Sequence, residues 1–284
     1  MPERNDPSLL AKLVDDVLTS SKYRDICPDL VSTIAAQELS KRRTPKEALK
    51  ATRSKLHQIG GAYLDGHEDY TAWLVALQGA MQVGDEEVLK GVCRQIMGHH
   101  ASTRERLPIL EEFYTTLFAA LPPIHSLLDI ACGLNPLAIP WMSLPVEADY
   151  YAYDIYRQMT GFLSSCCCCC FNRSLASAPV RLYAEAHDVI QSCPTQRADV
   201  ALVLKTLPCL EQVEKQAGYR LLRNLNVSYL VVSFPIHSLG GRSKGMAAYY
   251  ETHFHDLIGD EPWEVKKYTF ATELVFIVKK DVRG

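Results

Sequence analysis

The spacing of apolar residues changes near residue 105 of this 284-residue chain. Before that point apolar side chains recur every three or four positions, as they do between Leu9 and Leu18, which is the period of an amphipathic helix. Beyond Pro122, short apolar or β-branched runs alternate with longer segments of helical character. The pattern therefore predicts an all-helical domain over residues 1–105 and a domain of alternating strands and helices over residues 106–284.

Start and stop signals divide the first region into several helices. Pro28 can open one helix, and another is expected over residues 85–97. Residues 44–47, TPKE, combine a capping residue, a proline at the first helical position and a glutamate three residues after the cap. A helix should run from there toward His57, and the glycine pair at residues 60–61 should end it.

Seven short runs in the second region predict seven strands. The first five are separated by helical segments and should form a parallel sheet, whereas the last two lie close together and should pair as an antiparallel hairpin. A sheet of this kind binds its ligand outside the carboxyl ends of its strands. The runs are HSLLDIACG, ADYYAYD, PVRLYAEAHD, ADVALVLK, SYLVVSFP, EVKKYTF and TELVFIVKK.

The ends of the first three predicted strands carry candidate ligand-binding residues. The first strand leads into a tight turn at Gly133, which lacks the dinucleotide fingerprint because Ala131 stands where a first glycine is expected. Asp154 ends the second strand, where a carboxylate can accept both hydroxyls of a ribose. Asp188 follows the third strand, where it can accept from an adenine amino group beside the apolar Val189. Each aspartate could instead cap a helix, but in this order they predict an adenosine site.

Composition excludes several classes of protein. With 48% apolar and 22% charged residues, the chain has an ordinary globular balance. It contains no run of about 18 apolar residues that would predict a membrane span. Its first residues, MPERNDPSLL, lack the basic-then-apolar layout of a signal peptide. We therefore expect a cytoplasmic protein whose thiols stay reduced.

Positive charge is concentrated between residues 41 and 55, although the whole chain has a net charge of -3. The segment holds seven basic residues and the single acid Glu47, which leaves a local excess of six positive charges. It is either the solvated face of a helix or an electrostatic footprint for phosphate, and the second interpretation predicts docking on RNA. The basic residues are Lys41, Arg42, Arg43, Lys46, Lys50, Arg53 and Lys55.

Six blocks of the sequence carry a family resemblance. They are KLHQIGGAY (55–63), HHASTRERL (99–107), LLDIACGLNPLAIPWM (127–142), LVLKTLPCLE (202–211), VVSFPIHSLGGRSKGM (231–246) and ELVFIVKK (273–280). In order and spacing they resemble the aminoglycoside-resistance 16S rRNA (guanine(1405)-N(7))-methyltransferases. The resemblance covers nearly the whole chain.

The resemblance implies a fold, a cofactor and a substrate. The expected fold class is α/β: a class I, Rossmann-like methyltransferase with a seven-stranded, mostly parallel sheet, preceded by an N-terminal all-helical domain. Members of the family use S-adenosylmethionine to methylate N7 of a guanine in the decoding region of 16S rRNA within the assembled 30S subunit. This modification confers aminoglycoside resistance. We expect the helical domain to dock on that RNA, and the protein to act as a monomer without a metal or a membrane.

The resemblance also implies cofactor contacts at matching positions. Arg106 matches the arginine that holds the cofactor's carboxylate, a role that suits a planar guanidinium. Tyr63 matches an aromatic wall, although core packing is the alternative, and Ser102 could instead form a capping box with Glu105. The expected cofactor-binding residues are Tyr63, His100, Ala101, Ser102, Arg106, Ala131, Gly133, Asp154, Asp188, Val189 and Leu204.

The loop after the fifth strand should meet the target guanine, unless it is only a solvated surface loop. Arg242 and Lys244 could grip backbone phosphate, and Phe234 and Met246 could stack on or wedge beside the flipped base. Lys205 and Lys244 are expected to bind phosphate or the O6 atom of the base. These residues complete the predicted RNA-binding set, together with the basic segment of residues 41–55.

The target explains why no acid–base residues are expected. Guanine N7 has an in-plane lone pair and no proton, so its methylation needs a positioned base rather than a general base. Two other functions stay open from the sequence. One is an RNA-binding protein that keeps the methyltransferase fold without catalysis, and the other is a methyltransferase that acts on a small molecule.

Half of the ten cysteines are adjacent, at residues 166–170. They fall in the predicted crossover helix after Asp154, in which Met159 and Phe162 define an inward stripe. Cys166 should continue this stripe, as should Cys170, whereas Cys168 should point away. Because no second ligand pair completes a zinc site, we expect apolar packing rather than metal binding.

Overall fold

The chain's structure, a computed structural model, describes residues 7–61, 63–145, 147–166, 180–236 and 245–280. Its centre is one seven-stranded sheet in the order β3-β2-β1-β4-β5-β7-β6. The strands are β1 (Ser126–Ile130), β2 (Asp149–Asp154), β3 (Arg181–Ala186), β4 (Ala198–Leu204), β5 (Val227–Pro235), β6 (Glu264–Thr269) and β7 (Glu273–Lys279).

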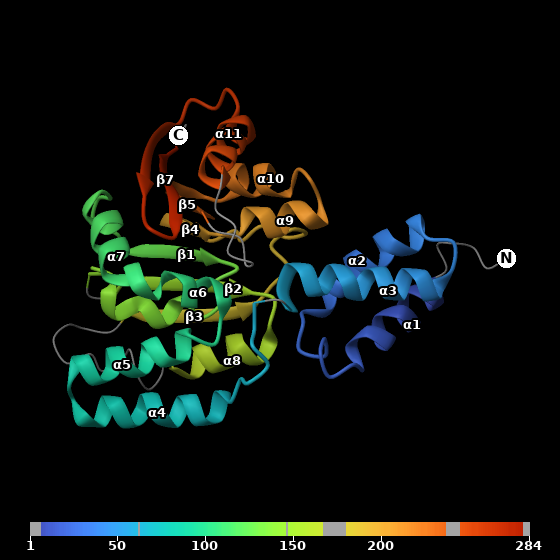
Figure 1. Cartoon of the computed structure of the whole chain (residues 1–284), viewed down its shortest axis with the longest axis horizontal. Helices are drawn as coiled ribbons and strands as arrows, with labels where there is room; N and C mark the ends of the chain where they lie inside the picture. The colour runs from blue at the N-terminus through green and yellow to red at the C-terminus, as the bar shows by residue number, and fades with distance from the viewer. Residues whose placement is uncertain (1–6, 62, 146, 167–179, 237–244, 281–284) are drawn as a thin grey trace.

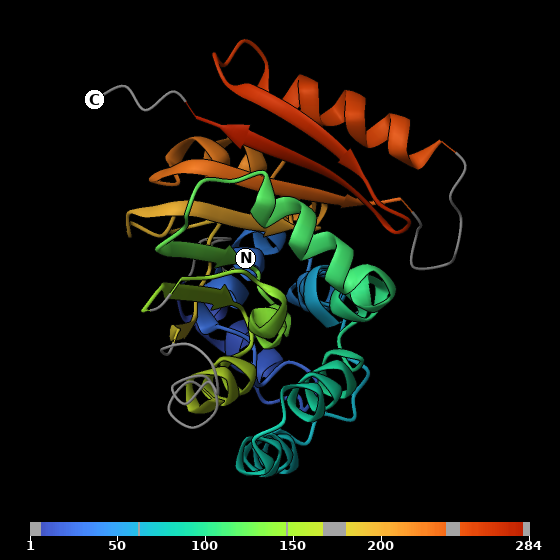
Figure 2. The same ribbon diagram turned by 90° about the vertical axis from the view of Figure 1, so that its left-hand side faces the viewer.

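The strand directions confirm the predicted fold class. Strands β1 to β5 pair in parallel, whereas β7 runs antiparallel between β5 and β6. Figure 2 shows this hairpin at one end of the sheet. The chain order reverses between β1 and β4, so the carboxyl ends of these two strands form a switch point at which α/β sheets bind ligands.

Alternating apolar residues give the sheet two covered faces. Along β4, Val200 and Leu202 belong to one buried cluster, and Ala201 and Val203 belong to the other. Buried residues of α7 (Leu110–Ala119) and α8 (Arg157–Cys166) belong to the first cluster. The second includes α9 (Leu207–Val213), α10 (Ala217–Asn224) and α11 (Met246–Ile258), which lie together on one side of the sheet in Figure 1.

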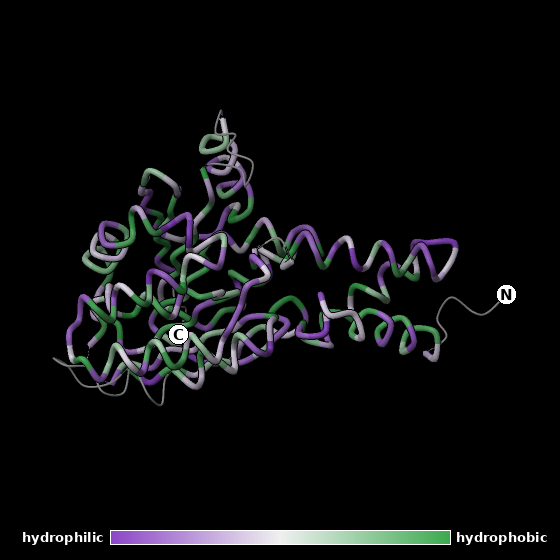
Figure 3. The backbone as a smooth tube through the Cα atoms, turned by 60° about the horizontal axis from the view of Figure 1, so that its bottom comes forward, coloured by the Kyte–Doolittle hydropathy of each residue, from purple (hydrophilic) through white to green (hydrophobic). Residues whose placement is uncertain are grey.

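Three N-terminal helices pack against one another and project from the sheet: α1 (Pro7–Leu18), α2 (Pro28–Lys41) and α3 (Pro45–Leu56). The predicted capping box of α3 is confirmed. Glu47 N–H donates to Thr44 Oγ1, and Thr44 N–H donates to the Glu47 carboxylate, both at 3.2 Å. Hydrophilic and hydrophobic positions alternate along these helices in Figure 3, as amphipathic helices require.

The glycine pair after α3 ends the helical path at Gly61, as predicted, but the last turn is not α-helical. The chain widens into a π-helical turn, η1 (His57–Gly61). Gly60 packs against the segment that follows β2, and a Cβ there would lie 2.8 Å from Ile155 Cδ1 and 2.9 Å from the Tyr156 hydroxyl oxygen. The missing side chain therefore lets this turn approach the sheet closely.

The remaining helices of the first region pack with the sheet. They are α4 (Tyr70–Val83), α5 (Glu86–Met97) and α6 (Ala101–Arg106), and the 3₁₀ turn η2 (Leu107–Ile109) follows. Helix α4 packs on α8 and lies beside α5 (Figure 1). Helix α5 also packs on the 3₁₀ turn η3 (Asn135–Trp141). Residues of α1–α3 share one buried cluster with the sheet although these helices project from it, and the division at residue 105 stays a prediction. Patterning predicts a helix but not which neighbour covers its apolar face.

Helix α8 confirms the predicted inward stripe. Met159, Phe162 and Leu163 are buried, and Cys166 continues the stripe at the helix end. Residues 167–170, which include the predictions for Cys168 and Cys170, lie outside the described residues. Within the described part of the chain, histidine, cysteine, aspartate and glutamate form no cluster of three or more that could hold a metal. No described helix is long and apolar enough to cross a membrane.

Candidate functional site

A cleft with an empty volume of about 740 Å³ opens at the carboxyl ends of the parallel strands, as the sequence predicts. Ala131 after β1, Asp154 at the end of β2 and Lys205 after β4 line it. Leu30 of α2 and Ile59 of η1 line it from the helical side. The cleft therefore lies between the sheet and the projecting helices, and both contribute side chains.

The turn after β1 brings backbone close to the cleft. Ala131 and Gly133 have positive φ angles of 52° and 53°. A Cβ on Gly133 would lie 2.6 Å from His100 Cε1, so only glycine allows the turn to approach this ring. Gly133 N–H donates to Asp154 Oδ2 at 2.8 Å, which ties the turn to the end of β2.

Asp154 is buried, and three backbone N–H groups hold its carboxylate. Besides Gly133, Ile155 and Tyr156 donate to Oδ1 at 2.7 and 3.2 Å. Burial raises the pKa of Asp154 to about 6, although the hydrogen bonds oppose the shift. A carboxylate has about four acceptor sites. About one therefore remains for a ligand, rather than the two ribose hydroxyls that the sequence suggested.

Asp188 and Val189 line the same cleft after β3. Asp188 Oδ1 accepts from Ile190 N–H at 3.0 Å, whereas Oδ2 is buried and has no hydrogen-bond partner among the described residues. Burial raises the pKa of this carboxyl above its usual value. An unpaired buried acceptor is costly unless a ligand satisfies it. Beside the apolar Val189, it suits a flat ring that carries an N–H donor.

Two aromatic rings line the cleft from the helical side. Tyr63 stacks on His100 with ring centroids 5.8 Å apart, and the Tyr63 hydroxyl lies 2.9 Å from Cys209 Sγ. Ala101 lies behind them, buried, and donates its N–H to the Tyr63 carbonyl at 2.7 Å. Burial and the neighbouring cations lower the pKa of His100 to about 3. Its imidazole is therefore neutral at physiological pH.

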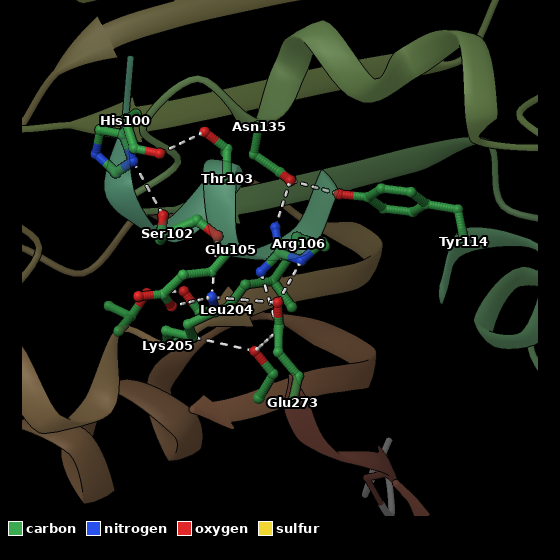
Figure 4. Close-up of polar contacts among 12 residues, drawn as sticks. His100, Ser102, Thr103, Glu105, Arg106, Tyr114, Asn135, Leu204, Lys205 and Glu273 are labelled. Atoms are coloured by element: carbon green, nitrogen blue, oxygen red, sulfur yellow. Dashed lines mark hydrogen bonds and ion pairs between the residues drawn. The ribbon is translucent and has the colours of Figure 1, made fainter. Parts of the chain in front are cut away.

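A buried network of charges lies behind the cleft (Figure 4). Glu273 at the start of β7 is fully buried and accepts from Arg106 Nε at 2.7 Å and from Arg106 Nη2 at 3.0 Å. Lys205 Nζ lies 3.4 Å from the same carboxylate and donates to Glu105 Oε2 at 2.8 Å and to the Ser102 carbonyl at 2.9 Å. Burial opposes ionisation, but the two cations hold the pKa of Glu273 below its usual value.

Two cations with predicted roles belong to this network. Arg106, expected to hold a carboxylate of the cofactor, is 1% exposed and is absent from the cleft lining; its guanidinium pairs with Glu273 and with Asn135 Oδ1. Lys205, expected to bind phosphate or the O6 atom of the base, is buried and lines the cleft. Both cations are desolvated, so each is stable only beside a carboxylate.

Of the two roles predicted for Ser102, a cofactor contact and a capping box with Glu105, the structure does not show the capping box. Its hydroxyl lies 3.0 Å from His100 Nδ1, and helix α6 begins at Ala101 without a side-chain cap. The capping box with Glu105 therefore does not form, because His100 rather than Ser102 occupies the N-cap position, and Glu105 pairs with Lys205. Ser102 and Leu204 both line the cleft.

The prediction that Phe234 contacts the flipped base is wrong. Phe234 is fully buried and stacks on Tyr250 at a centroid distance of 4.9 Å, among the residues that α11 contributes to the core. Side chains alternate between the two faces of β5, and Phe234 lies on the face that α11 covers. Met246 begins α11 and is half-buried, whereas Arg242 and Lys244 lie outside the described residues.

The basic segment spans the end of α2 and most of α3. Arg42 and Lys55 pair with the buried carboxylate of Glu38 at 2.9 and 3.3 Å, so part of the charge is compensated within the helical unit. Lys46 and Lys50 lie one turn apart on α3 and are exposed. The exposed members are Lys41, Arg42, Arg43, Lys46 and Lys50, and the half-buried members are Arg53 and Lys55.

Several residues of the cleft lining were not predicted. Ile155, Ile190 and Thr206 could have been found, because they adjoin predicted strand ends. No signal in the sequence marks Leu30 or Ile59, whose apolar side chains look like ordinary helix core. The unpredicted residues are Leu30, Ile59, Gly60, Tyr153, Ile155, Tyr156, His187, Ile190, Thr206, Cys209, Leu210 and Val213.

Comparisons with known proteins agree with this geometry. The family model for ribosomal RNA methyltransferase (FmrO) matches residues 19–277. A 16S rRNA (guanine(1405)-N(7))-methyltransferase of Frankia casuarinae is 37% identical, and the alignment covers 98% of this chain and 96% of that protein. A protein of the same name from Serratia marcescens is 35% identical over 93% of this chain and 96% of its own. The crystal structure of the 16S rRNA methyltransferase RmtF in complex with S-adenosyl-L-homocysteine superposes with a TM-score of 0.78, at 32% identity and 99% coverage of both chains.

The buried ion pair predicts a large loss of stability when Arg106 is removed. Arg106→Ala leaves Glu273 with one cation fewer in a desolvated site, and we expect the free energy of unfolding to fall by about 3–5 kcal/mol. Urea denaturation measures this change. Arg104→Ala is the matched control, because Arg104 is exposed two positions earlier, and its effect should stay within about 0.5 kcal/mol. Equal stability of the two variants would contradict the structural role of Arg106.

Proposed function

The chain belongs to the ribosomal RNA methyltransferase (FmrO) family, and from this premise we propose that it methylates N7 of a decoding-site guanine of 16S rRNA. The methyl donor is S-adenosylmethionine, and the product confers aminoglycoside resistance. We further propose that the substrate is the assembled 30S subunit, and that the protein acts on it in the cytoplasm as a monomer. The observation that carries the proposal is the cleft at the switch point of the sheet, with Asp154 and Asp188 at its lip.

The residues of the cleft fit an adenosine group. The buried, unpaired Asp188 Oδ2 can accept from an exocyclic amino group, and Val189 can pack beside the ring. Asp154 retains about one acceptor site for a ribose hydroxyl. Both features support these two aspartates as the holders of the nucleoside.

The other end of the cleft fits a zwitterionic amino acid group. Lys205 Nζ lies at the cleft wall and already has three acceptors, so it would bind a carboxylate in place of Glu105, the more exposed of its carboxylate partners. In this proposal Lys205 binds the carboxylate of the cofactor, which the resemblance assigns to Arg106. Arg106 then acts through Glu273, which keeps Lys205 in place. The neutral imidazole of His100 adds no positive charge beside a cationic donor group.

Catalysis in this site consists of positioning. S-adenosylmethionine supplies, when bound, a methyl group on a positively charged sulfur. Guanine N7 offers a lone pair without a proton, so no side chain of the chain has to remove one. The chain must hold the base in line and exclude water, and the apolar lining from Leu30, Ile59 and Leu210 serves the second requirement.

The exposed cations of α2 and α3 support RNA docking. Lys46 and Lys50 repeat at helical spacing on α3, on the unit that also lines the cleft through Leu30 and Ile59. A phosphate backbone bound along this face would be presented to the cleft mouth. Binding should therefore weaken steeply as the salt concentration rises.

The direct test is transfer of a labelled methyl group from S-adenosylmethionine. Purified protein is incubated with whole 30S subunits or with free 16S rRNA, and the label is mapped along the RNA. We expect label at one decoding-site guanine in the subunits. Absence of label from subunits would overturn the proposed function, and label on free RNA alone would contradict the assembled subunit as substrate.

The pKa of Asp154 predicts a pH dependence of cofactor binding. A hydroxyl donor stabilises the ionised carboxylate, so the bound state has the lower pKa and affinity should fall as pH drops through about 6. Asp188, whose pKa is also raised, shifts affinity in the same direction. We expect a loss of up to about tenfold per pH unit for each proton taken up. Calorimetric titration with S-adenosylhomocysteine measures it.

Asp154→Asn is the control for this pH dependence. The amide cannot ionise, so the variant should bind weakly at neutral pH and should lose the part of the pH dependence that Asp154 contributes. A wild-type affinity that stays constant as pH falls well below 6 would contradict the assignment.

Charge reversal on α3 tests RNA docking. Lys46→Glu with Lys50→Glu should weaken binding to 30S subunits and lower the slope of log affinity against log salt by about 2, because two phosphate contacts are lost. Cofactor affinity should not change. Arg42 is left intact because it also holds Glu38. The charge-matched control is Arg197→Glu with Lys266→Glu, two exposed positions before β4 and on β6, away from the cleft, and equal effects of both pairs would contradict docking through α3.

A further inference from the structure

Tyr249 is a large aromatic residue that the structure leaves in solvent. Its side chain lies in the first turns of α11 and is 64% exposed. On the same helix, Phe254 and Ile258 are buried in the core. Tyr249 lies on the face of α11 opposite to these two residues, so helical spacing places its side chain in solvent.

The ring of Tyr249 is nevertheless held in a defined orientation. It lies parallel to the imidazole of His253, with an interplanar angle of 5° and centroids 6.0 Å apart, and edge-on to Tyr250 at 5.2 Å. Tyr250 in turn stacks on the buried Phe234. His253 is itself fixed, because its Nε2 lies 2.8 Å from Glu211 Oε2. An aromatic ring that is fixed on one side and open to solvent elsewhere is a stacking platform.

This platform lies beside the mouth of the cleft. Helix α11 packs on β5, which runs parallel to β4, and it lies on the same side of the sheet as α9 (Figure 1). Glu211, which holds His253, belongs to α9, and the neighbouring Cys209 and Leu210 line the cleft. Burial, together with Tyr249, Cys209 and Glu211 nearby, raises the pKa of Tyr250. Tyr249 and the cleft are therefore linked through one continuous set of contacts.

The two acidic side chains nearest to the platform both make contacts of their own. Glu211 of α9 pairs with His253, and Glu251 of α11 pairs with Lys267 at 2.7 Å. A flat, unstacked nucleobase is the ligand that such a ring recognises, because every base offers a π-face to an aromatic side chain.

We propose that Tyr249 stacks on an unstacked base of the rRNA at the mouth of the cleft and so helps to position the target guanine. The proposal rests on the function proposed above. Within it, Tyr249 is a substrate-binding residue, and His253 is a positioning residue that acts through the Tyr249 ring. Phe234, which the sequence suggested for this stacking role, serves instead as the buried support beneath Tyr250.

The experiment compares methyl transfer to 30S subunits by Tyr249→Ala, Tyr249→Phe and the wild-type chain. Loss of stacking on one base predicts that Tyr249→Ala lowers kcat/KM by about 10- to 100-fold. Tyr249→Phe keeps the ring and should recover most of this loss. S-adenosylhomocysteine affinity should be the same in all three proteins, because Tyr249 does not line the cleft. Tyr183→Ala is the matched control: Tyr183 is 50% exposed on the edge strand β3 and stacks on Tyr151.

A spectroscopic readout separates stacking from a structural role. The fluorescence of the added indole in Tyr249→Trp is obtained by subtracting the wild-type emission. Addition of 30S subunits should quench this fluorescence. Wild-type kcat/KM in Tyr249→Ala, or equal losses in the Ala and Phe variants, would overturn the stacking proposal alone. Failure of the wild-type chain itself to label subunits would overturn the proposed function, and the stacking proposal with it.

Discussion

One fully buried carboxylate organises the part of the molecule around the cleft. Glu273 binds Arg106 of α6 and lies 3.4 Å from Lys205 Nζ after β4, and it accepts from Ser233 Oγ of β5 at 2.7 Å. The cations are desolvated, and an unpaired charge in such a site costs several kcal/mol. Pairing therefore fixes α6 against the sheet, and with α6 it fixes His100 and Ser102 at the wall of the cleft.

A second set of contacts ties the projecting helices to the same place. Cys27 N–H donates to the Ile155 carbonyl at 2.7 Å, and Arg157 N–H donates to the Asp25 carbonyl at 2.9 Å. These bonds join the start of α2 to the segment directly after Asp154. The helices that carry the basic segment are thus held in a fixed position relative to the nucleoside end of the cleft, so RNA bound by α3 and a ligand bound by Asp154 would keep a set geometry.

The arrangement suits a reaction that needs position rather than proton transfer. The titratable groups of the cleft are held in defined states: His100 is kept neutral, and Lys205 is kept beside carboxylates. Asp154 is oriented by three backbone donors before any ligand arrives. Such preorganisation reduces the rearrangement that binding requires.

The sequence by itself determined the fold class and the polar lip of the cleft. A change of apolar period distinguishes helices from strands, and the capping signal of Thr44 is local, so both can be read without knowing the neighbours. Asp154, Asp188 and Gly133 were predictable because residues at the carboxyl ends of parallel strands meet at one edge. The tertiary structure alone decided the rest. The partner of Arg106 is 167 positions away, Phe234 faces the side of β5 that α11 covers, and Leu30 and Ile59 reach the cleft only because α2 and η1 fold against it. Such pairings depend on which distant segments meet, and neither periodicity nor spacing along the chain encodes that directly.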